Sequence, residues 1–551
     1  MACLVSCRGL LPPLAIAAGL VALSAPVACR ASAADVLTYH NDANRTGWFS
    51  AETTLTPANV SPSTFGLLTT VTLDGRVDAE PLVAFAQPID GQGTHDVVYV
   101  ATEGDTVFAL DAESGATLWT RNFGTPVPYQ YKDGDDNVYP VMGILSTPVI
   151  DRTRNVLYVV ADTYANSVDN FTLHAIALNN GSDSVTPVQI EATESLQKRE
   201  VWKFNPRHQL QRPALLEANG SIYLTFGSTG DIQPSISRGF ITRYDAGTLA
   251  PLDSALTDIS VENQFSPFYL SSIWQSGFGP AADSSGNVYF STGNSNWQKA
   301  SYKKNVNYPD SVLEISPDLS TLLQSFTPSN YFQLDQGDVD LGSGGTLVLP
   351  DQSGAYPHLA VAGGKDGRVW LLNRDDMGGF HTRANRVLDV ETMGSCWCGP
   401  AYYVGSDGRA RVVTGGGNGV AVWAVGTTAP KLIAEGSTGS VPVDGYPDDG
   451  GTIPVVSSNG TVAESALIWF IQRPLSSEDQ DPGTPVMLWA YDPGNLKKAL
   501  FSAQAGTWTH AVNSNANLVP TVAGGHVYVA SNEQLQIFGL LSPSNRKKAG
   551  K

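Results

Sequence analysis

The sequence predicts an all-β protein, an eight-bladed β-propeller of four-stranded antiparallel blades. Three observations predict it: β-branched and aromatic runs recur in pairs, helical periodicity is nearly absent, and the 551 residues include 54 Gly and 34 Pro. A strand pair cannot bury both of its faces, whereas blades around an axis can, and they leave few open edges. A row of β-sandwich domains is the alternative, but the sequence shows no linkers between such domains.

The repeated unit is an apolar run, a glycine or polar turn, and a second alternating run. About eight such units recur, which is typical of a repeat architecture. Their first runs begin at residues 97, 156, 221, 287, 358, 410, 466 and 526. We therefore expect the propeller to occupy residues 35–541, with the stretch "LTYHNDANRTGWF" joining the last blade to close the ring and a polar tail at 542–551.

The N-terminus has the pattern of a secretory signal. Arg8 precedes an apolar run over about residues 10–28, and Ala33 ends a small-residue cleavage sequence, so residues 1–34 are expected to be removed. A membrane anchor is the alternative, but three prolines interrupt the run. Lipidation of Cys29 is disfavoured because Pro26 stands where a larger apolar residue is preferred. We expect an exported protein, periplasmic or secreted, with no membrane span after cleavage.

Charge and cysteine content restrict the function. The formal net charge is -19, which excludes nucleic acid as a partner because phosphate binding needs a basic face. After cleavage, the chain keeps Cys396 and Cys398 in "GSCWCGP". We interpret them as two small turn residues; a redox or metal pair is the alternative, although no CxxC or His pair lies nearby to complete a metal site.

The first repeat contains "ALDAESGATLW". It resembles the tryptophan-docking motif of the pyrroloquinoline quinone (PQQ) repeat propellers, a resemblance that extends over nearly the whole mature chain. The resemblance implies that Trp119 wedges between neighbouring blades, while Asp111 and Gly115 shape the turn that aims it. Because scaffolds and binding modules share this repeat, it predicts a fold and not a function.

Four segments resemble the cofactor site of the PQQ-dependent alcohol dehydrogenases, in the family's order. In "GSTGD", Ser228 matches a residue that binds a PQQ carboxylate. Asp231 matches a metal ligand, although the family has Glu there and a shorter following loop. In "SSIWQSGFGPAADSSGNVYFSTGNSNW", Trp274 matches the floor under PQQ and Asn294 a metal ligand, with Trp297 after the turn. Trp is a good flat partner for a quinone, and an amide oxygen is a hard ligand.

The other two segments supply acids and a cation. In "LDQGDVDLGSGG", Asp338 matches the aspartate that is both metal ligand and general base, with Asp335 three residues before it. Asp340 stands where lanthanide-dependent members carry an extra aspartate. In "GGKDGRVWLLNR", Lys365 matches the cation that polarises the quinone. Each segment also has a structural interpretation: polar turns, packing between blades, or acids exposed on a loop.

The resemblance implies an exported dehydrogenase that oxidises an alcohol or sugar-type substrate by hydride transfer to PQQ bound with calcium or a lanthanide. Asp338 would take the hydroxyl proton. Some expected parts are missing: Met142 and Gly143 replace the adjacent cysteines, and no CxxCH supplies a haem, so an enzyme would need a separate electron acceptor. The alternative is a cofactor-free propeller that acts as a binding or scaffold module.

Overall fold

The structure is a computed structural model and describes residues 34–132, 138–229, 238–261, 270–426, 428–439, 450–472, 483–508 and 517–543. The predicted signal segment up to residue 33, the tail from residue 544 and Asp231 lie outside these residues. In the described part, no helix combines the length and the apolar composition that a membrane span needs.

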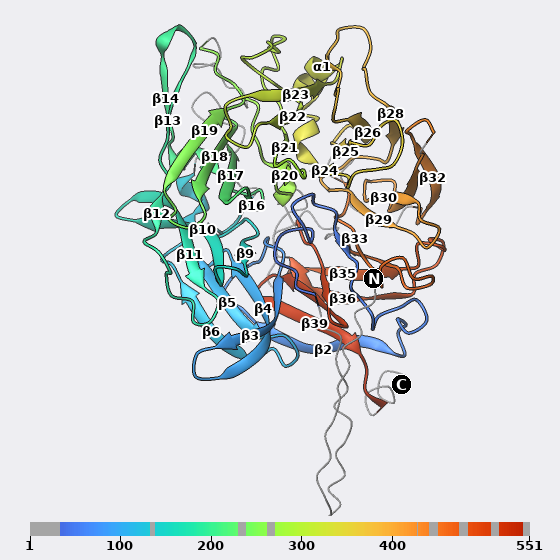
Figure 1. The fold of residues 1–551 in the computed structure, drawn as a ribbon. Coiled ribbons are helices and arrows are strands. Elements are labelled where there is room, and N and C mark those ends of the chain that lie inside the picture. Colours follow the sequence, from blue (N-terminus) through green and yellow to red (C-terminus); the bar gives the residue numbers. More distant parts are fainter. Residues whose placement is uncertain are drawn as a thin grey trace, which may run out of the picture.

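The chain forms an eight-bladed β-propeller, as predicted, and its blades follow one another in sequence order around the ring (Figure 1). The first four blades, from the axis outward, have these strands. Blade 1 has β3 (Leu82–Ile89), β4 (Gly93–Thr102), β5 (Thr106–Asp111) and β6 (Thr117–Asn122). Blade 2 has β9 (Val149–Asp151), β10 (Val156–Ala165), β11 (Val168–Ala177) and β12 (Val188–Gln189). Blade 3 has β15 (Gln209–Leu210) and β16 (Leu216–Ala218), both paired with β17 (Ser221–Ser228), then β18 (Phe240–Asp245) and β19 (Pro251–Leu256). Blade 4 has β20 (Ala281–Ala282), β21 (Val288–Ser291), β22 (Val312–Ile315), β23 (Leu322–Thr327) and β27 (Gly379–Phe380).

The remaining blades complete the ring. Blade 5 has β24 (Thr346–Val348), β25 (Leu359–Gly363), β26 (Arg368–Asn373) and β28 (Asp389–Thr392). Blade 6 has β29 (Ala401–Val404), β30 (Ala410–Thr414), β31 (Ala421–Val425) and β32 (Leu432–Ser437). Blade 7 has β33 (Val455–Ser457), β34 (Leu467–Gln472), β35 (Thr484–Tyr491) and β36 (Phe501–Trp508), with β1 (Trp48–Phe49) parallel to β33. Blade 8 has β37 (Thr521–Ala523), β38 (His526–Ser531), β39 (Gln534–Leu540) and β2 (Phe65–Thr72).

Short elements lie in the connections. Two small sheets pair β7 (Val127–Pro128) with β8 (Val141–Met142) and β13 (Thr193–Ser195) with β14 (Val201–Lys203). The helices are η1 (Tyr129–Tyr131), η2 (Gln197–Arg199), η3 (Pro206–His208), η4 (Gln275–Gly277), α1 (Tyr331–Gly337) and η5 (Leu341–Ser343).

Trp119 joins blades 1 and 2 as the docking motif implied. Its indole Nε1 donates to the carbonyl of Leu178 at 3.0 Å. Gly181 lies beneath the ring, where an added Cβ would come within 2.8 Å of it. Asp111 accepts from the backbone N–H of Ser114 at 2.9 Å, and Gly115 has a φ of +73°, which glycine adopts without steric cost. The turn therefore aims the indole at the neighbouring blade.

The prediction for the N-terminal stretch was wrong. Ring closure is made by β2, whose residues pair antiparallel with β39. The earlier residues 36–52, here called the axial strap, do not join this last blade as a strand. Figure 1 shows this dark-blue part of the chain crossing the middle of the ring. The cause is its turn-rich sequence: His40, Asn41 and Arg45 all have positive φ, so the segment bends repeatedly and cannot form a continuous edge strand.

The axial strap bonds to every blade, at the innermost strand or a residue near it. The bonds join Val36 to Val83, Leu37 to Ile150, Arg45 to Leu215, Ala43 to Ala282, Asn44 to Val348, Thr46 to Tyr402, Gly47 to Val456 and Glu52 to Gly525. Tyr39 and His40 also pack on Phe278, with ring centroids 5.3 and 5.0 Å away. The strap therefore fills the axis on one side of the segment that carries Trp274.

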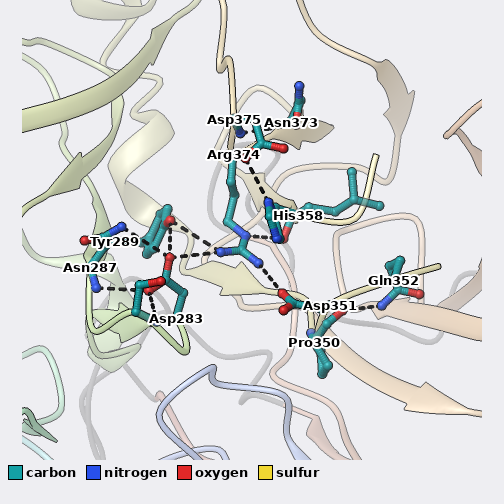
Figure 2. A network of polar contacts seen from close by, with 12 residues as sticks. Asp283, Asn287, Tyr289, Pro350, Asp351, Gln352, His358, Asn373, Arg374 and Asp375 are labelled. Atoms are coloured by element: carbon teal, nitrogen blue, oxygen red, sulfur yellow. Dashed lines mark hydrogen bonds and ion pairs between the residues drawn. The ribbon is translucent and has the colours of Figure 1, made fainter. Parts of the chain in front are cut away.

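A buried ion network joins blades 4 and 5. The Arg374 guanidinium, whose side chain is 5% exposed, lies 3.0 Å from Asp283 Oδ2 and 3.1 Å from Asp351 Oδ1. It also donates to the carbonyl of Leu359 at 3.1 Å, and Tyr289 donates to Asp283 at 2.8 Å. Figure 2 shows Arg374 between the acids of the two blades. Because Arg374 is buried, the network depends on its acids being present to compensate its charge.

Candidate functional site

The predicted site residues that the structure describes come from separate loops that meet at one end of the axis. Trp274 precedes η4, Asn294 follows β21, Lys365 lies in the turn between β25 and β26, and Asp338 ends helix α1. These loops are far apart in sequence, and the propeller brings them together because each precedes or follows a strand near the axis. Their contacts are as follows.

Asn294 lies at the centre of the acidic loops. It is 1% exposed, its backbone N–H donates to Asp340 Oδ1 at 2.8 Å, and its side-chain Nδ2 donates to Asp338 Oδ1 at 2.7 Å. Within the described residues, its side-chain oxygen Oδ1 is buried and has no hydrogen-bond partner. A buried amide oxygen ordinarily finds a donor or a cation, so this atom is a candidate ligand atom.

Lys365 is the cation of the site. Its side chain is 8% exposed, and its Nζ lies 3.0 Å from Asp340 Oδ2 and 3.7 Å from Asp338 Oδ1. It also donates to the backbone carbonyl of Asp338 at 3.2 Å. Asp340 is equally buried, whereas the Asp338 side chain is 53% exposed. Asp340 therefore holds the lysine, and Asp338 faces the solvent side of the site.

Trp274 lies among cations and a second tryptophan. Lys365 Nζ lies 5.5 Å from its ring centroid, and the Arg212 guanidinium carbon lies 5.3 Å away. Trp397 meets the ring edge to face, with centroids 5.2 Å apart and planes at 73°. Lys365 Nζ also lies 5.1 Å from the Trp397 ring centroid. The lysine is thus within cation–π distance of both indoles.

Trp397 was missed as a site residue. The structure corrects the interpretation of its neighbours as two simple turn residues, because Cys396 and Cys398 form a disulfide and both are 1% exposed. The "CWC" sequence was the available signal, but Trp397 is 123 residues after Trp274 in the chain, and only the ring of blades brings them together.

Ser228 lies beside the Trp274 segment. Its backbone N–H donates to Ser272 Oγ at 3.1 Å, and that hydroxyl donates to Ser228 Oγ at 2.9 Å. Gly227 lies so close that an added Cβ would come within 3.1 Å of the Trp274 Cβ. Asp231, the remaining predicted ligand, lies outside the described residues. Trp297 is 46% exposed at the end of the Asn294 turn.

Two further acids lie beneath these residues. Asp335 Oδ1 accepts from the backbone N–H of Ser295 at 2.7 Å, and Asp310 Oδ1 accepts from the backbone N–H of Leu341 at 2.9 Å. Burial raises the pKa of Asp335 to about 8, and repulsion from Asp340 adds to it. Burial, with repulsion from Asp335 and Asp340, also raises the pKa of Asp310 well above its usual range. Burial and mutual repulsion thus favour the neutral forms of both acids.

A second charged group lies on the Arg212 side. Arg76 bonds to Glu103 Oε2 through both Nε, at 3.0 Å, and Nη2, at 2.8 Å. Burial raises the pKa of Asp78 above its usual range, while the charges of Arg76 and Arg212 act in the opposite direction. Gly143 packs on the Glu103 backbone: a Cβ added at this position would come within 2.3 Å of the Glu103 carbonyl oxygen. The described residues contain no group of three or more His, Cys, Asp or Glu side chains placed to hold a metal.

Solved structures share the fold. The quinohemoprotein alcohol dehydrogenase from Comamonas testosteroni matches 92% of this chain over 80% of its own length, with a TM-score of 0.58 and 13% identity. The quinohemoprotein alcohol dehydrogenase ADHIIG from Pseudomonas putida HK5 matches with the same coverage and identity and a TM-score of 0.56. A europium-containing methanol dehydrogenase matches 92% of this chain over 98% of its own, with a TM-score of 0.59 and 12% identity.

No family model and no curated protein matches the sequence. At 12% and 13% identity, the structural likeness concerns the path of the backbone and leaves the chemistry of the site to be argued from its own residues. The chain therefore has the eight-bladed propeller fold of the quinoprotein alcohol and methanol dehydrogenases.

Proposed function

We propose that the chain is an exported PQQ-dependent dehydrogenase-like protein that oxidises an alcohol or a sugar-type substrate. One observation carries the proposal: contacts link the four residues that the resemblance assigns to the quinone and its cation. Asn294 bonds to Asp338, Asp338 pairs with Lys365, and Lys365 lies over the Trp274 ring. They come from four separate loops, so their meeting is not a consequence of sequence proximity.

The residues present fit a quinone and a cation. The buried Asn294 Oδ1, which has no partner in the described part, is the oxygen that the resemblance gives to calcium or a lanthanide. The Trp274 ring offers a flat aromatic surface, and Lys365 and Arg212 place positive charge around it for an anionic ligand. PQQ, when bound, supplies the acceptor for the two electrons and the hydrogen of a hydride.

The chain's own residues supply the rest. The Asp338 carboxylate lies on the exposed side of the site and accepts a hydrogen bond from Asn294 Nδ2. We therefore assign Asp338 the role of the base that takes the substrate hydroxyl proton. Asp340 fixes Lys365, whose positive charge would stabilise negative charge that develops on the oxygens of a bound quinone. A separate acceptor must then remove the electrons, since the sequence has no CxxCH haem attachment motif.

The second candidate is a cofactor-free propeller that acts as a binding or scaffold module. The packing around Trp274 favours it: Trp397, only 7% exposed, already contacts the ring that a quinone would use. A quinone stacked on Trp274 has to share the surroundings of this ring with Trp397, Lys365 and Arg212.

Retention of PQQ separates the two candidates. The purified exported protein is mixed with PQQ and either calcium or a lanthanide and desalted, and quinone absorbance and dye-linked alcohol oxidation are measured. We expect retained quinone with at least one metal, weaker retention in Asn294→Ala, and retention without turnover in Asp338→Asn. Asp318→Asn, in an exposed turn, is the matched control and behaves like the wild type. No retention with either metal would refute the enzyme proposal.

A further inference from the structure

The bridged tripeptide Cys396–Trp397–Cys398 is a closed unit in which one residue separates the two linked cysteines. Such a short ring removes most of the backbone freedom of the residue that it encloses. The direction in which Trp397 leaves the backbone is therefore fixed by the bridge.

The tripeptide is attached to the loop that carries the acids of the site. Ser343 Oγ donates to the carbonyl of Cys396 at 2.7 Å, and the backbone N–H of Gly345 donates to the carbonyl of Cys398 at 3.2 Å. Ser343 Oγ also bonds to the carbonyl of Asp340 at 2.9 Å. On the other side, the N–H of Trp397 donates to the carbonyl of Gly450 at 2.8 Å. The position of the indole relative to Asp340 and Lys365 therefore depends on these bonds and on the bridge.

We propose that the Cys396–Cys398 disulfide is a redox-sensitive clamp that positions Trp397 as a wall of the axial ligand site. The nature of the ligand rests on the proposed function, whereas the positioning does not. Trp397 is a positioning residue: it and Trp274 flank Lys365, at 5.1 and 5.5 Å from Nζ, and it meets Trp274 at 5.2 Å.

Reduction opens the clamp. A small dithiol gives two electrons and two protons; the S–S bond breaks, two S–H bonds form, and the reductant becomes a disulfide. The backbone around Trp397 then gains conformational freedom, and Lys365 loses one of its two aromatic neighbours. Since cation–π and edge-to-face contacts are lost together, binding at the site weakens by about tenfold.

The first test needs no ligand. Near-ultraviolet circular dichroism of the full exported chain reports the coupling of the two indoles, and thiols are counted in parallel. We expect the same band to be lost in Trp397→Ala and in Trp274→Phe, and to be weakened in wild type reduced by dithiothreitol and in Cys396→Ser/Cys398→Ser. The far-ultraviolet spectrum stays unchanged. Trp489→Phe, which removes a tryptophan from blade 7, is the control and keeps the band. A band that survives opening of the bridge would overturn the clamp.

The second test measures PQQ retention with the metal that supports it. Cys396→Ser/Cys398→Ser and Trp397→Ala should bind about tenfold more weakly, and Trp397→Phe should recover most of the binding, because a phenyl ring also accepts a cation on its face. Equal binding by Trp397→Ala and wild type would overturn the role of Trp397 as a wall. If wild type retains no PQQ while the dichroism band responds to the bridge, the proposed function fails and the clamp stands.

Discussion

Replacing Lys365 by Met tests whether the site is held together by its own charges. Met keeps the length and the apolar stem of Lys but removes the charge. In the structure, Lys365 Nζ lies 3.0 Å from Asp340 Oδ2, and both side chains are 8% exposed. The substitution therefore leaves Asp340 as a buried carboxylate to which the backbone N–H of Asn294 still donates.

The magnitude follows from burial. Removing one partner of a buried ion pair costs about 3–5 kcal/mol, because the other charge stays buried without compensation. Asp338 adds less than about 1 kcal/mol, since its side chain is 53% exposed and water screens its attraction to Lys365. The cation–π contacts with Trp274 and Trp397 add about 1–2 kcal/mol. We expect Lys365→Met to lower the free energy of unfolding by about 4–8 kcal/mol.

The assay is a double-mutant cycle by urea unfolding at neutral pH without ligand. The pair Asp340→Asn/Lys365→Met carries no charge, and Asn keeps an oxygen for the N–H of Asn294, so the pair should lose no more than about 2 kcal/mol. The coupling energy between the two positions should then exceed about 2 kcal/mol. A single variant as stable as wild type, or a double variant no better than Lys365→Met, would refute the assignment of Asp340 as the residue that holds the lysine.

Three further predictions concern the fold around the site. Burial raises the pKa of Glu80 to about 8, so the folded protein keeps a proton that the unfolded chain releases above its ordinary pKa of 4.5. Stability from this group is therefore present at low pH and lost as the pH rises from about 4.5 to about 8, and wild type should lose about 1.4 kcal/mol per pH unit relative to Glu80→Gln across this window, as measured by urea unfolding. Arg374→Met should cost about 3 kcal/mol because it leaves Asp283 buried without its cation, and Asp283→Asn/Arg374→Met should recover most of the loss; equal unfolding midpoints for the two variants would contradict this. Arg45→Met should cost about 2–4 kcal/mol by leaving the carbonyls of three segments without their donor, while Lys substitution should recover only part of it in a thermal melt.

The blades were predictable because strands repeat a local pattern. Runs such as "VVYVA" and "HVYVA" are rich in β-branched and aromatic residues and end at turns, and the structure places them in β4 and β38, the strand next to the innermost one of each blade. The axial strap was not predictable in this way. Its bonds are long-range and mostly between backbone atoms, so the identities of its side chains do not indicate which residues it bonds to.

The candidate site residues came only from the resemblance, and their roles stay a prediction. Asn294 and Lys365 stand in recognisable turns, and the structure brings them together with Asp338. Trp397 belongs to no such turn. It lies between blades 5 and 6, whereas Trp274 lies between blades 3 and 4, and the closed ring brings the two together. A contact of this kind depends on the curvature of the whole molecule, which no local window of the sequence contains.

The axial strap also has a consequence for how the ring can evolve. Between Val36 and Glu52 it makes at least one hydrogen bond to each of the eight blades. If a blade were duplicated or deleted, the innermost strands of the following blades would no longer face their present partners in the strap. Buried polar groups of the backbone would then lack hydrogen bonds, each at a cost of about 1–3 kcal/mol. The strap thus favours a ring of eight blades, because a ring with more or fewer blades loses some of these hydrogen bonds.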